Sequence, residues 1–246
     1  DEYFKINLDG TKILLQNFIK IKKIIFASTS SVYGEVSSND FPVSENHLLN
    51  PISPYGESKK LAEEFCQQFV IKNQIELVIL RFYTVFGPRQ RPDEAFTKFI
   101  RLILDKKPVP IYGDGLNVRD WLYVIDHCRA IDAIVNDGRL GEAYNIGGNN
   151  EKTNLEITKN LLDFLGRDES LITYVDDRRA HDRRYAIDSS KIQDELSWEP
   201  SVDFKEGIAK TFDWYKANRK WVEKLEANMV ERKHQVISKE PLKASR

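Results

Sequence analysis

Hydrophobic residues along the chain alternate between short apolar runs and stripes of helical spacing. Residues 22–29 and 76–87 are apolar runs typical of buried strands, and each follows a stretch with helical character, at 2–20 and 55–74. The pattern further predicts, in order, a helix at 93–106, a strand at 109–115, a strand leading into a helix at 119–136, a strand at 142–148, and helices at 153–166 and 208–225. This alternation favours an α/β fold with a parallel sheet and helices on its faces.

An α/β sheet that binds a dinucleotide normally opens with a strand, a glycine-rich turn and a helix, where backbone N–H groups hold the pyrophosphate. The sequence contains no G-x-G-x-x-G pattern, and it begins within a predicted helix. We therefore expect the chain to be the later part of a longer protein. From Glu226 onward the hydrophobic content falls and charges crowd together, so 226–246 is predicted to be a flexible tail.

Composition narrows the function classes further. The 246 residues carry a formal net charge of −1, so bulk electrostatics give no reason to expect a nucleic-acid or membrane-surface partner. No apolar run approaches the roughly 20 residues that span a bilayer. The two cysteines, Cys66 and Cys128, favour a reducing cytoplasm over a disulfide framework. His47, His127 and His234 have no partners at metal-ligand spacing, so no metal site is expected.

The candidate chemistry starts at Tyr55 and Lys59, in "PISPYGESKKLAEEF". Positions i and i+4 of a helix share a face, so the lysine can lie beside the phenol. A free phenol has a pKa of roughly 10, and a neighbouring ammonium favours its ionised form. The pair is therefore a candidate general base, although this spacing alone often means only a half-buried tyrosine beside a solvated lysine.

A second group of hydroxyls, in "STSSVYGE" at 28–35, follows the first predicted strand. Ligands of open α/β sheets bind at the carboxyl ends of the strands, so these side chains are expected at the same edge as Tyr55. Their alternative role is turn formation.

Together these motifs resemble the extended short-chain dehydrogenase/reductases that act on nucleotide sugars. Thr29, Tyr55 and Lys59 resemble that family's (Ser/Thr)…Tyr-x-x-x-Lys triad, and "LRFYTVFGPRQRPD", "PVPIYGDGLNVRDWLYVIDHCRAI" and "AYNIGG" recur in it in this order. The resemblance implies NAD as cofactor, held in part by Tyr55 and Lys59, a nucleotide-diphosphate sugar as substrate, and a homodimer. It implies a partial Rossmann-type parallel sheet, with its N-terminal strands missing, and a small C-terminal substrate-binding subdomain.

The resemblance also divides the chain into domains. Residues 1–83 and 113–146 correspond to the remainder of the NAD-binding domain, and residues 84–112 and 147–225 to the subdomain that binds the nucleotide sugar.

The resemblance does not settle the reaction. "GDGLNVRDWLYVIDHCRAI" and "HDRRYAIDSSKI" are similar to dTDP-glucose 4,6-dehydratases, whereas "STSSVYGE" and "RFYTVFGPRQRPDEAF" are similar to nucleotide-sugar 4-epimerases. In the dehydratases, adjacent Asp and Glu after the triad threonine move the C5 proton and protonate the leaving C6 hydroxyl. Ser30 and Ser31 occupy those places here, and a serine is too weak an acid near pH 7. We therefore expect a 4-epimerase, with a dehydratase and a catalytically silent nucleotide-sugar-binding protein as alternatives.

The resemblance also implies which residues hold the substrate, and they come from several parts of the chain. Arg119 is suited to a bidentate grip on a phosphate. Arg89, like Arg91, could meet a substrate carboxylate or be a solvated loop arginine. The other expected substrate contacts, besides Thr29 itself, are Ser30, Ser31, Thr84, Pro110, Ile111, Asn154, Arg178 and His181.

Overall fold

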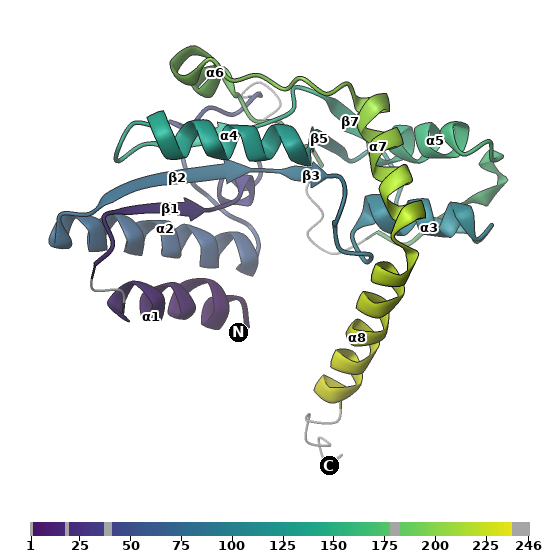
Figure 1. Cartoon of the computed structure of the whole chain (residues 1–246), viewed down its shortest axis with the longest axis horizontal. Helices are drawn as coiled ribbons and strands as arrows, with labels where there is room; N and C mark the ends of the chain where they lie inside the picture. Colours follow the sequence, from purple (N-terminus) through teal and green to yellow (C-terminus); the bar gives the residue numbers. More distant parts are fainter. Residues whose placement is uncertain (1, 18–19, 37–40, 178–182, 238–246) are drawn as a thin grey trace.

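The computed structural model describes residues 2–17, 20–36, 41–177 and 183–237. Its first part is a parallel three-stranded sheet with helices on both faces (Figure 1). The elements of this part are the π-helix Phe4–Asp9, α1 (Gly10–Asn17), β1 (Lys23–Ala27), the 3-10 helix η2 (Ser30–Val32), α2 (Pro54–Asn73), β2 (Glu76–Phe82), α4 (Val124–Asp137), β6 (Ala143–Ile146) and α6 (Ser190–Leu196). The strand order β1-β2-β6, all parallel, confirms the predicted α/β class.

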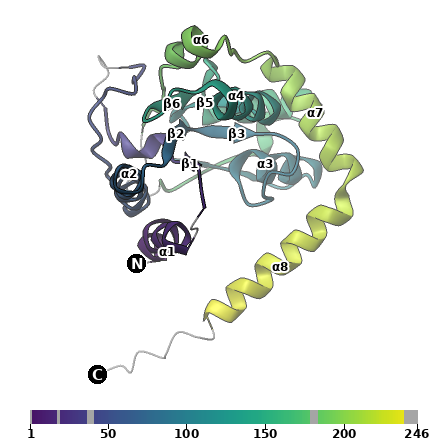
Figure 2. The same cartoon turned by 60° about the vertical axis from the view of Figure 1, so that its left-hand side comes forward.

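Alternation along β2 explains why both faces of this sheet are covered. Leu77 and Ile79 point into a core shared with α1 and α2, whereas Val78 and Leu80 point into a core shared with α4 and α6. Successive side chains of a strand face opposite sides, so a strand buried on both faces is apolar throughout. In Figure 2, α2 and α1 accordingly lie on one side of the sheet and α4 lies on the other.

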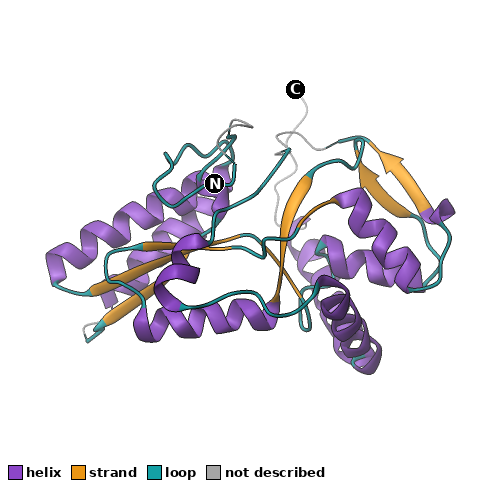
Figure 3. Cartoon of the chain, turned by 90° about the horizontal axis from the view of Figure 1, so that it is seen from above, coloured by secondary structure: helices purple, strands orange, loops and turns teal. Residues whose placement is uncertain are grey.

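The second part of the chain is built from shorter strands (Figure 3), and its side chains form a separate core. Its elements are β3 (Thr84–Phe86), α3 (Ala95–Leu104), β4 (Val109–Tyr112), β5 (Val118–Tyr123), β7 (Glu151–Thr153), α5 (Asn154–Phe164), β8 (Ile172–Val175), α7 (Phe204–Ala217) and α8 (Arg219–Ile237). β5 pairs with β3 in parallel and with β7 in antiparallel, while β4 and β8 form a parallel pair. The subdomain boundaries expected from the sequence stay a prediction.

The structure corrects the sequence reading in three places. The apolar run 76–87 is two strands, because β3 leaves the first sheet to pair with β5. The last predicted helix is two helices, α7 and α8, which meet at Asn218. The helix α8 extends to Ile237, so part of the segment 226–246, which was expected to be a flexible tail, is helical. Residues 238–246 lie outside the described part of the chain.

The start of α2 is fixed by its sequence. The Ser53 hydroxyl accepts a hydrogen bond from the Gly56 N–H at 3.1 Å, and Pro54 takes the first helical position, where no intrahelical N–H is needed. These two devices place Tyr55 in the first turn, at the carboxyl edge of the parallel sheet. A capping box likewise fixes the start of α5, with Thr153 and Glu156 accepting hydrogen bonds from each other's backbone N–H groups.

Candidate active site

Thr29 and Tyr55 meet at the carboxyl end of β1. Thr29 is the second residue after the strand and caps η2 by accepting a hydrogen bond from the Ser31 N–H. Its hydroxyl also hydrogen-bonds the Tyr55 phenol, which lies across from it at the start of α2. The structure therefore brings together two of the three residues expected to form the catalytic group.

Lys59 also reaches this edge of the sheet, but its ammonium group does not stabilise the phenolate as expected. Its Nζ donates to the Ala27 carbonyl at 2.5 Å and lies 4.5 Å from the centre of the Phe26 ring. Burial lowers the pKa of Lys59 and raises the pKa of Tyr55; the hydrogen bond with Thr29 acts in the opposite direction on the phenol. In this structure the phenol is therefore held in its neutral form.

A chain of hydroxyl groups continues inward from Tyr55. The Thr29 hydroxyl donates to the Ser31 hydroxyl at 3.2 Å, and Ser31 in turn hydrogen-bonds the phenol of Tyr185. Burial raises the pKa of Tyr185 to about 12, so this phenol stays protonated at neutral pH. Ser30 instead turns to the backbone, 3.4 Å from the Phe82 carbonyl.

Tyr185 belongs to the candidate site but was not singled out in the sequence. It lies in the motif "HDRRYAIDSSKI", of which only His181 was expected to contact the substrate. The Arg119 guanidinium lies 4.4 Å from the centre of the Tyr185 ring. The Tyr83 ring also packs against the Tyr185 ring, with ring centres 3.8 Å apart. Tyr185 thus connects the hydroxyl chain with a predicted phosphate-binding arginine.

Arg119 also lines a pocket of about 290 Å³, whose other lining residues are distant from it in the sequence. Five of the expected substrate-binding residues line it together: Thr84, Pro110, Ile111, Arg119 and Asn154. They come from β3, β4, β5 and the first position of α5, four elements that pack around the second core. Its volume is near the lower limit typical of small-molecule sites.

The remaining expected contacts are not assembled here. Arg91 forms an exposed ion pair with Asp93 at 2.7 Å, and the Arg89 guanidinium lies 5.7 Å from the centre of a Trp214 ring. Both arginines are thus engaged at positions that match the solvated-loop alternative. Arg178 and His181 lie outside the described residues.

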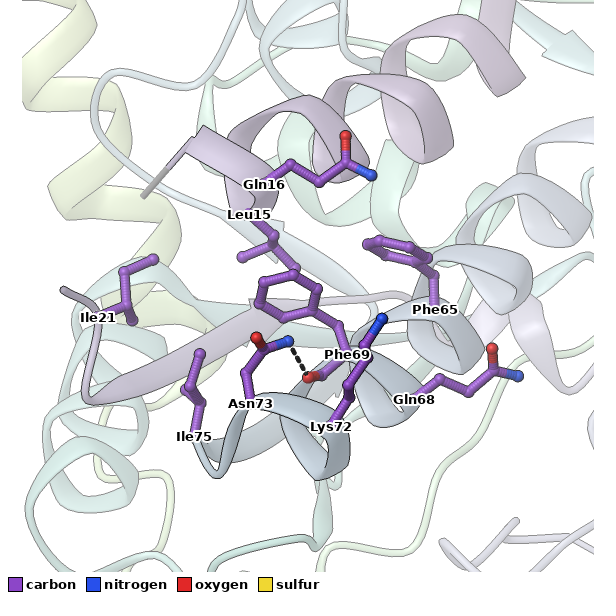
Figure 4. A pocket seen from close by; sticks show the side chains of 9 residues that line it. All are labelled: Leu15, Gln16, Ile21, Phe65, Gln68, Phe69, Lys72, Asn73 and Ile75. Atoms are coloured by element: carbon purple, nitrogen blue, oxygen red, sulfur yellow. Dashed lines mark hydrogen bonds between the residues drawn. The ribbon is translucent and has the colours of Figure 1, made fainter. Parts of the chain in front are cut away.

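A larger hollow of about 610 Å³ lies between α1 and α2 (Figure 4). Phe65, Phe69 and Lys72 line its α2 side, and Leu15 and Gln16 line its α1 side. Phe65 is about 15 Å along the helix from Tyr55 at 1.5 Å per residue. The hollow therefore lies away from the hydroxyl chain, and it is not the candidate active site.

At Gly56, next to Tyr55, α2 packs closely against the backbone of Ser31. A Cβ at this position would lie 2.6 Å from the Ser31 carbonyl oxygen and 2.9 Å from the Pro51 Cβ. Gly56→Ala is therefore expected to push α2 away from Thr29 and to destabilise the protein by about 1–3 kcal/mol. An alanine inside a helix otherwise stabilises relative to glycine, so the expected sign is inverted here.

The matched control for this substitution is Gly10→Ala at the start of α1. A Cβ at Gly10 meets only the Lys5 carbonyl oxygen, at an ordinary 3.8 Å. Urea unfolding should show Gly10→Ala as neutral or stabilising by up to about 1 kcal/mol. If Gly56→Ala proved equally harmless, α2 would not depend on this close approach.

Other kinds of site find no support in the described residues. Within 2–17, 20–36, 41–177 and 183–237, no group of three histidine, cysteine or carboxylate side chains could hold a metal ion. None of the described helices is both long and apolar enough to cross a membrane.

The chain is similar to known proteins that act on nucleotide sugars. A family profile described as GDP-mannose 4,6 dehydratase matches residues 1–211. The dTDP-glucose 4,6-dehydratase of Actinoplanes sp. is 43% identical over 217 residues, which are 87% of this chain and 67% of that protein. The chain thus spans about two thirds of the length of this relative.

Two solved structures also resemble the chain closely. The dTDP-glucose 4,6-dehydratase from Bacillus anthracis, in complex with NAD, superimposes with a TM-score of 0.84 at 40% identity, covering 90% of this chain and 71% of that one. The UDP-glucuronic acid 4-epimerase from Bacillus cereus, in complex with UDP-glucuronic acid and NAD, gives 0.81 at 36% identity, covering 87% and 68%.

Proposed function

The chain belongs to the extended short-chain dehydrogenase/reductase family of NAD-dependent nucleotide-sugar epimerases and dehydratases, and from this premise we propose that it acts as a nucleotide-sugar 4-epimerase. Within that family assignment, the observation that carries the choice is the pair Ser30 and Ser31. They follow Thr29 where a dehydratase needs an acid and a base, and both hydroxyls are engaged within the protein.

The residues at the end of β1 fit the nicotinamide-ribose end of NAD. The Lys59 ammonium already lies at the carboxyl edge of the parallel sheet, bonded to Ala27, and Tyr55 opens the neighbouring helix. Tyr55 and Lys59 would hold this end of the cofactor. NAD, when bound, supplies the acceptor and donor of the hydride at sugar C4.

The proton chemistry belongs to Tyr55. The Tyr55 oxygen, once ionised, takes the proton of the sugar 4-hydroxyl as C4 is oxidised to a ketone, while Thr29 holds the substrate oxygen in place. After the 4-keto sugar has turned over, C4 is reduced from its other face and Tyr55 returns the same proton to O4. The balance closes without any further acid or base, which agrees with serines at positions 30 and 31.

The diphosphate is expected to occupy the pocket that Thr84, Arg119 and Asn154 line. Arg119 supplies a guanidinium suited to phosphate oxygens. Because the Arg119 guanidinium also lies over the Tyr185 ring, the substrate's diphosphate and its sugar would meet the two ends of one connected network.

A 4,6-dehydratase is the second candidate, and one structural observation favours it. Asp93 and Glu94 line the pocket, so two carboxyl groups from another loop stand near the substrate. The higher identity with dehydratases, 43% against 36% for the epimerase structure, points the same way. These carboxyl groups would then have to supply the acid and the base.

Product analysis separates the two reactions. The full-length protein would be given NAD and, separately, UDP-glucose, UDP-glucuronate and dTDP-glucose, and each sugar would be examined by NMR. We expect inversion at C4 with C6 retaining its oxygen. A 6-deoxy-4-keto sugar would overturn the epimerase proposal and direct attention to Asp93 and Glu94. No turnover with NAD bound would favour a catalytically silent binding protein.

A further inference from the structure

The loop at 87–94 forms part of the wall of the pocket of about 290 Å³. It connects β3 with α3, and its last two residues line the pocket together with Ala95 and Lys98 of α3. The loop backbone bends sharply, since Gly87 and Arg89 have positive φ angles of 152° and 65°. The position of such an irregular segment depends on the groups that bind its backbone. The anchors of this loop therefore help to decide the shape of the pocket.

Side chains hold the carbonyl groups in and beside this loop. The Thr97 hydroxyl donates to the Arg91 carbonyl at 2.6 Å, and the Gln90 side-chain amide donates to the Val85 carbonyl at 3.0 Å. Both of these contacts are local in the sequence. The Gln90 carbonyl, in contrast, accepts a hydrogen bond from the hydroxyl of Tyr215, which belongs to α7 and lies 125 residues away in the chain. Tyr215 thus ties the loop to a different element.

The helix α7 is a firm support for the loop, because it packs closely against the second core. A Cβ at Gly207 would lie 2.8 Å from the Phe86 ring, so the helix backbone lies directly against that ring. Tyr215 itself is only 7% exposed. The neighbouring Trp214 contacts the same loop, with the centre of its ring 5.7 Å from the Arg89 guanidinium. The end of α7 therefore meets the loop at two successive positions.

Tyr215 acts from outside the pocket. It lines a separate hollow of about 180 Å³ where α3, α7 and α8 meet (Figure 1). Thr97 and Ile100 of α3 line this hollow, whereas Ala95 and Lys98 line the pocket, so the two spaces lie on different sides of α3. Any effect of Tyr215 on the pocket must therefore pass through the loop and α3.

We propose that Tyr215 is a positioning residue of the nucleotide-sugar site, and that its hydroxyl holds the loop 87–94 in the place that shapes the diphosphate pocket. This inference rests on the proposed function, because it takes that pocket as the site of the diphosphate. A ligand binds the molecules whose loop is in place, so its apparent affinity falls with their fraction. The loss of one hydrogen bond is enough to lower such a fraction by about 5–10-fold.

Tyr215→Phe tests the inference, because it removes the hydroxyl and keeps the ring. Isothermal titration of the NAD-loaded full-length protein with UDP, and separately with dTDP, identifies the nucleotide that binds more tightly. That nucleotide should bind Tyr215→Phe about 5–10-fold more weakly than the unmodified protein. In turnover assays KM should rise by a similar factor, and kcat should stay within a factor of about two, because the proton-transfer groups are unchanged.

Limited digestion with trypsin reports on the loop itself. Arg89 is exposed and directly precedes Gln90, the residue that Tyr215 anchors. The bond after Arg91 is followed by Pro92 and resists trypsin, so cleavage within the loop has to follow Arg89. Proteases cut chain segments that have opened. Cleavage after Arg89, measured by mass spectrometry, should therefore be about 5–10-fold faster in Tyr215→Phe.

Tyr144→Phe is the matched control, since it removes another buried hydroxyl in the first part of the chain. The Tyr144 hydroxyl donates to Glu195 at 2.7 Å and accepts from the Arg139 N–H at 3.0 Å. Circular dichroism should show both variants folded, and Tyr144→Phe should leave nucleotide affinity and cleavage after Arg89 unchanged. Unchanged affinity or unchanged cleavage in Tyr215→Phe, or equal changes in the two variants, would overturn the inference.

The two proposals can fail separately. Arg119→Leu should weaken nucleotide binding through the lost phosphate contact. If it did so while Tyr215→Phe bound normally, the role of Tyr215 would be removed and the pocket would remain the diphosphate site. A 6-deoxy-4-keto product, together with the expected weakening in Tyr215→Phe, would remove the epimerase while leaving the role of Tyr215, because both reactions bind the diphosphate.

Discussion

Replacing Tyr55 with phenylalanine is expected to lower kcat by about 10²–10⁴-fold, the range typical of a lost general acid/base. The substitution removes the phenol oxygen that hydrogen-bonds Thr29 but keeps the ring, which packs edge-on against Tyr3 with ring centres 5.8 Å apart. Because the oxygen acts in the proton transfer, KM should change much less than kcat. Turnover followed by NMR of the sugar measures both.

Tyr174→Phe provides the control, because it removes a phenol from an exposed residue of β8. Its kcat should stay within a factor of about two, as for other surface substitutions. Since burial raises the pKa of Tyr55, activity of the unmodified protein should also increase with pH as the phenol ionises. If Tyr55→Phe retained more than a tenth of kcat, another group would have to move the O4 proton.

Local patterns in the sequence were sufficient to predict that Thr29 and Tyr55 lie at the same edge of the sheet. Thr29 follows an apolar run typical of a buried strand, and Ser53 and Pro54 mark the start of the next helix. Both ends therefore lie at the same edge of a parallel sheet. No comparable local signal existed for Glu94 or Tyr185, because their place depends on how loops far apart in the chain pack together.

Packing between distant parts of the chain also explains where the observed fold differs from the predicted one. The apolar run at 76–87 gives no sign of its division, since β3 remains extended and apolar while it changes its partner from the first sheet to β5. In the helical stretch at 2–20, the apolar residues Ile13 and Leu14 are 61% and 57% exposed. The helix there buries Leu15 instead. Periodicity identifies an element, but the neighbours that cover it decide which face is buried.

Arg81 is a charged residue inside an otherwise apolar run. Its replacement by methionine is expected to destabilise the protein by about 3–5 kcal/mol. Arg81 lies in the middle of the buried run and forms a two-pronged ion pair with Glu63 of α2, at 3.2 and 2.7 Å. The two side chains are only 6% and 2% exposed. The guanidinium also donates to the Tyr33 hydroxyl, which donates to Asn145 of β6. Removing it leaves the Glu63 carboxylate buried without its partner.

Urea unfolding followed by circular dichroism measures this loss, and two further variants establish its cause. Arg81→Met combined with Glu63→Leu should recover most of the stability, because a buried ion pair costs about as much desolvation as it returns in attraction. Arg184→Met, which removes the more exposed pair with Glu151, should cost no more than about 1 kcal/mol. A double variant no more stable than Arg81→Met alone would show that Tyr33 and Asn145, rather than the unpaired carboxylate, account for the loss. Because this network ties α2 to β2 and β6, its disruption should also lower activity in proportion to the fraction unfolded, and kcat per folded molecule should be retained.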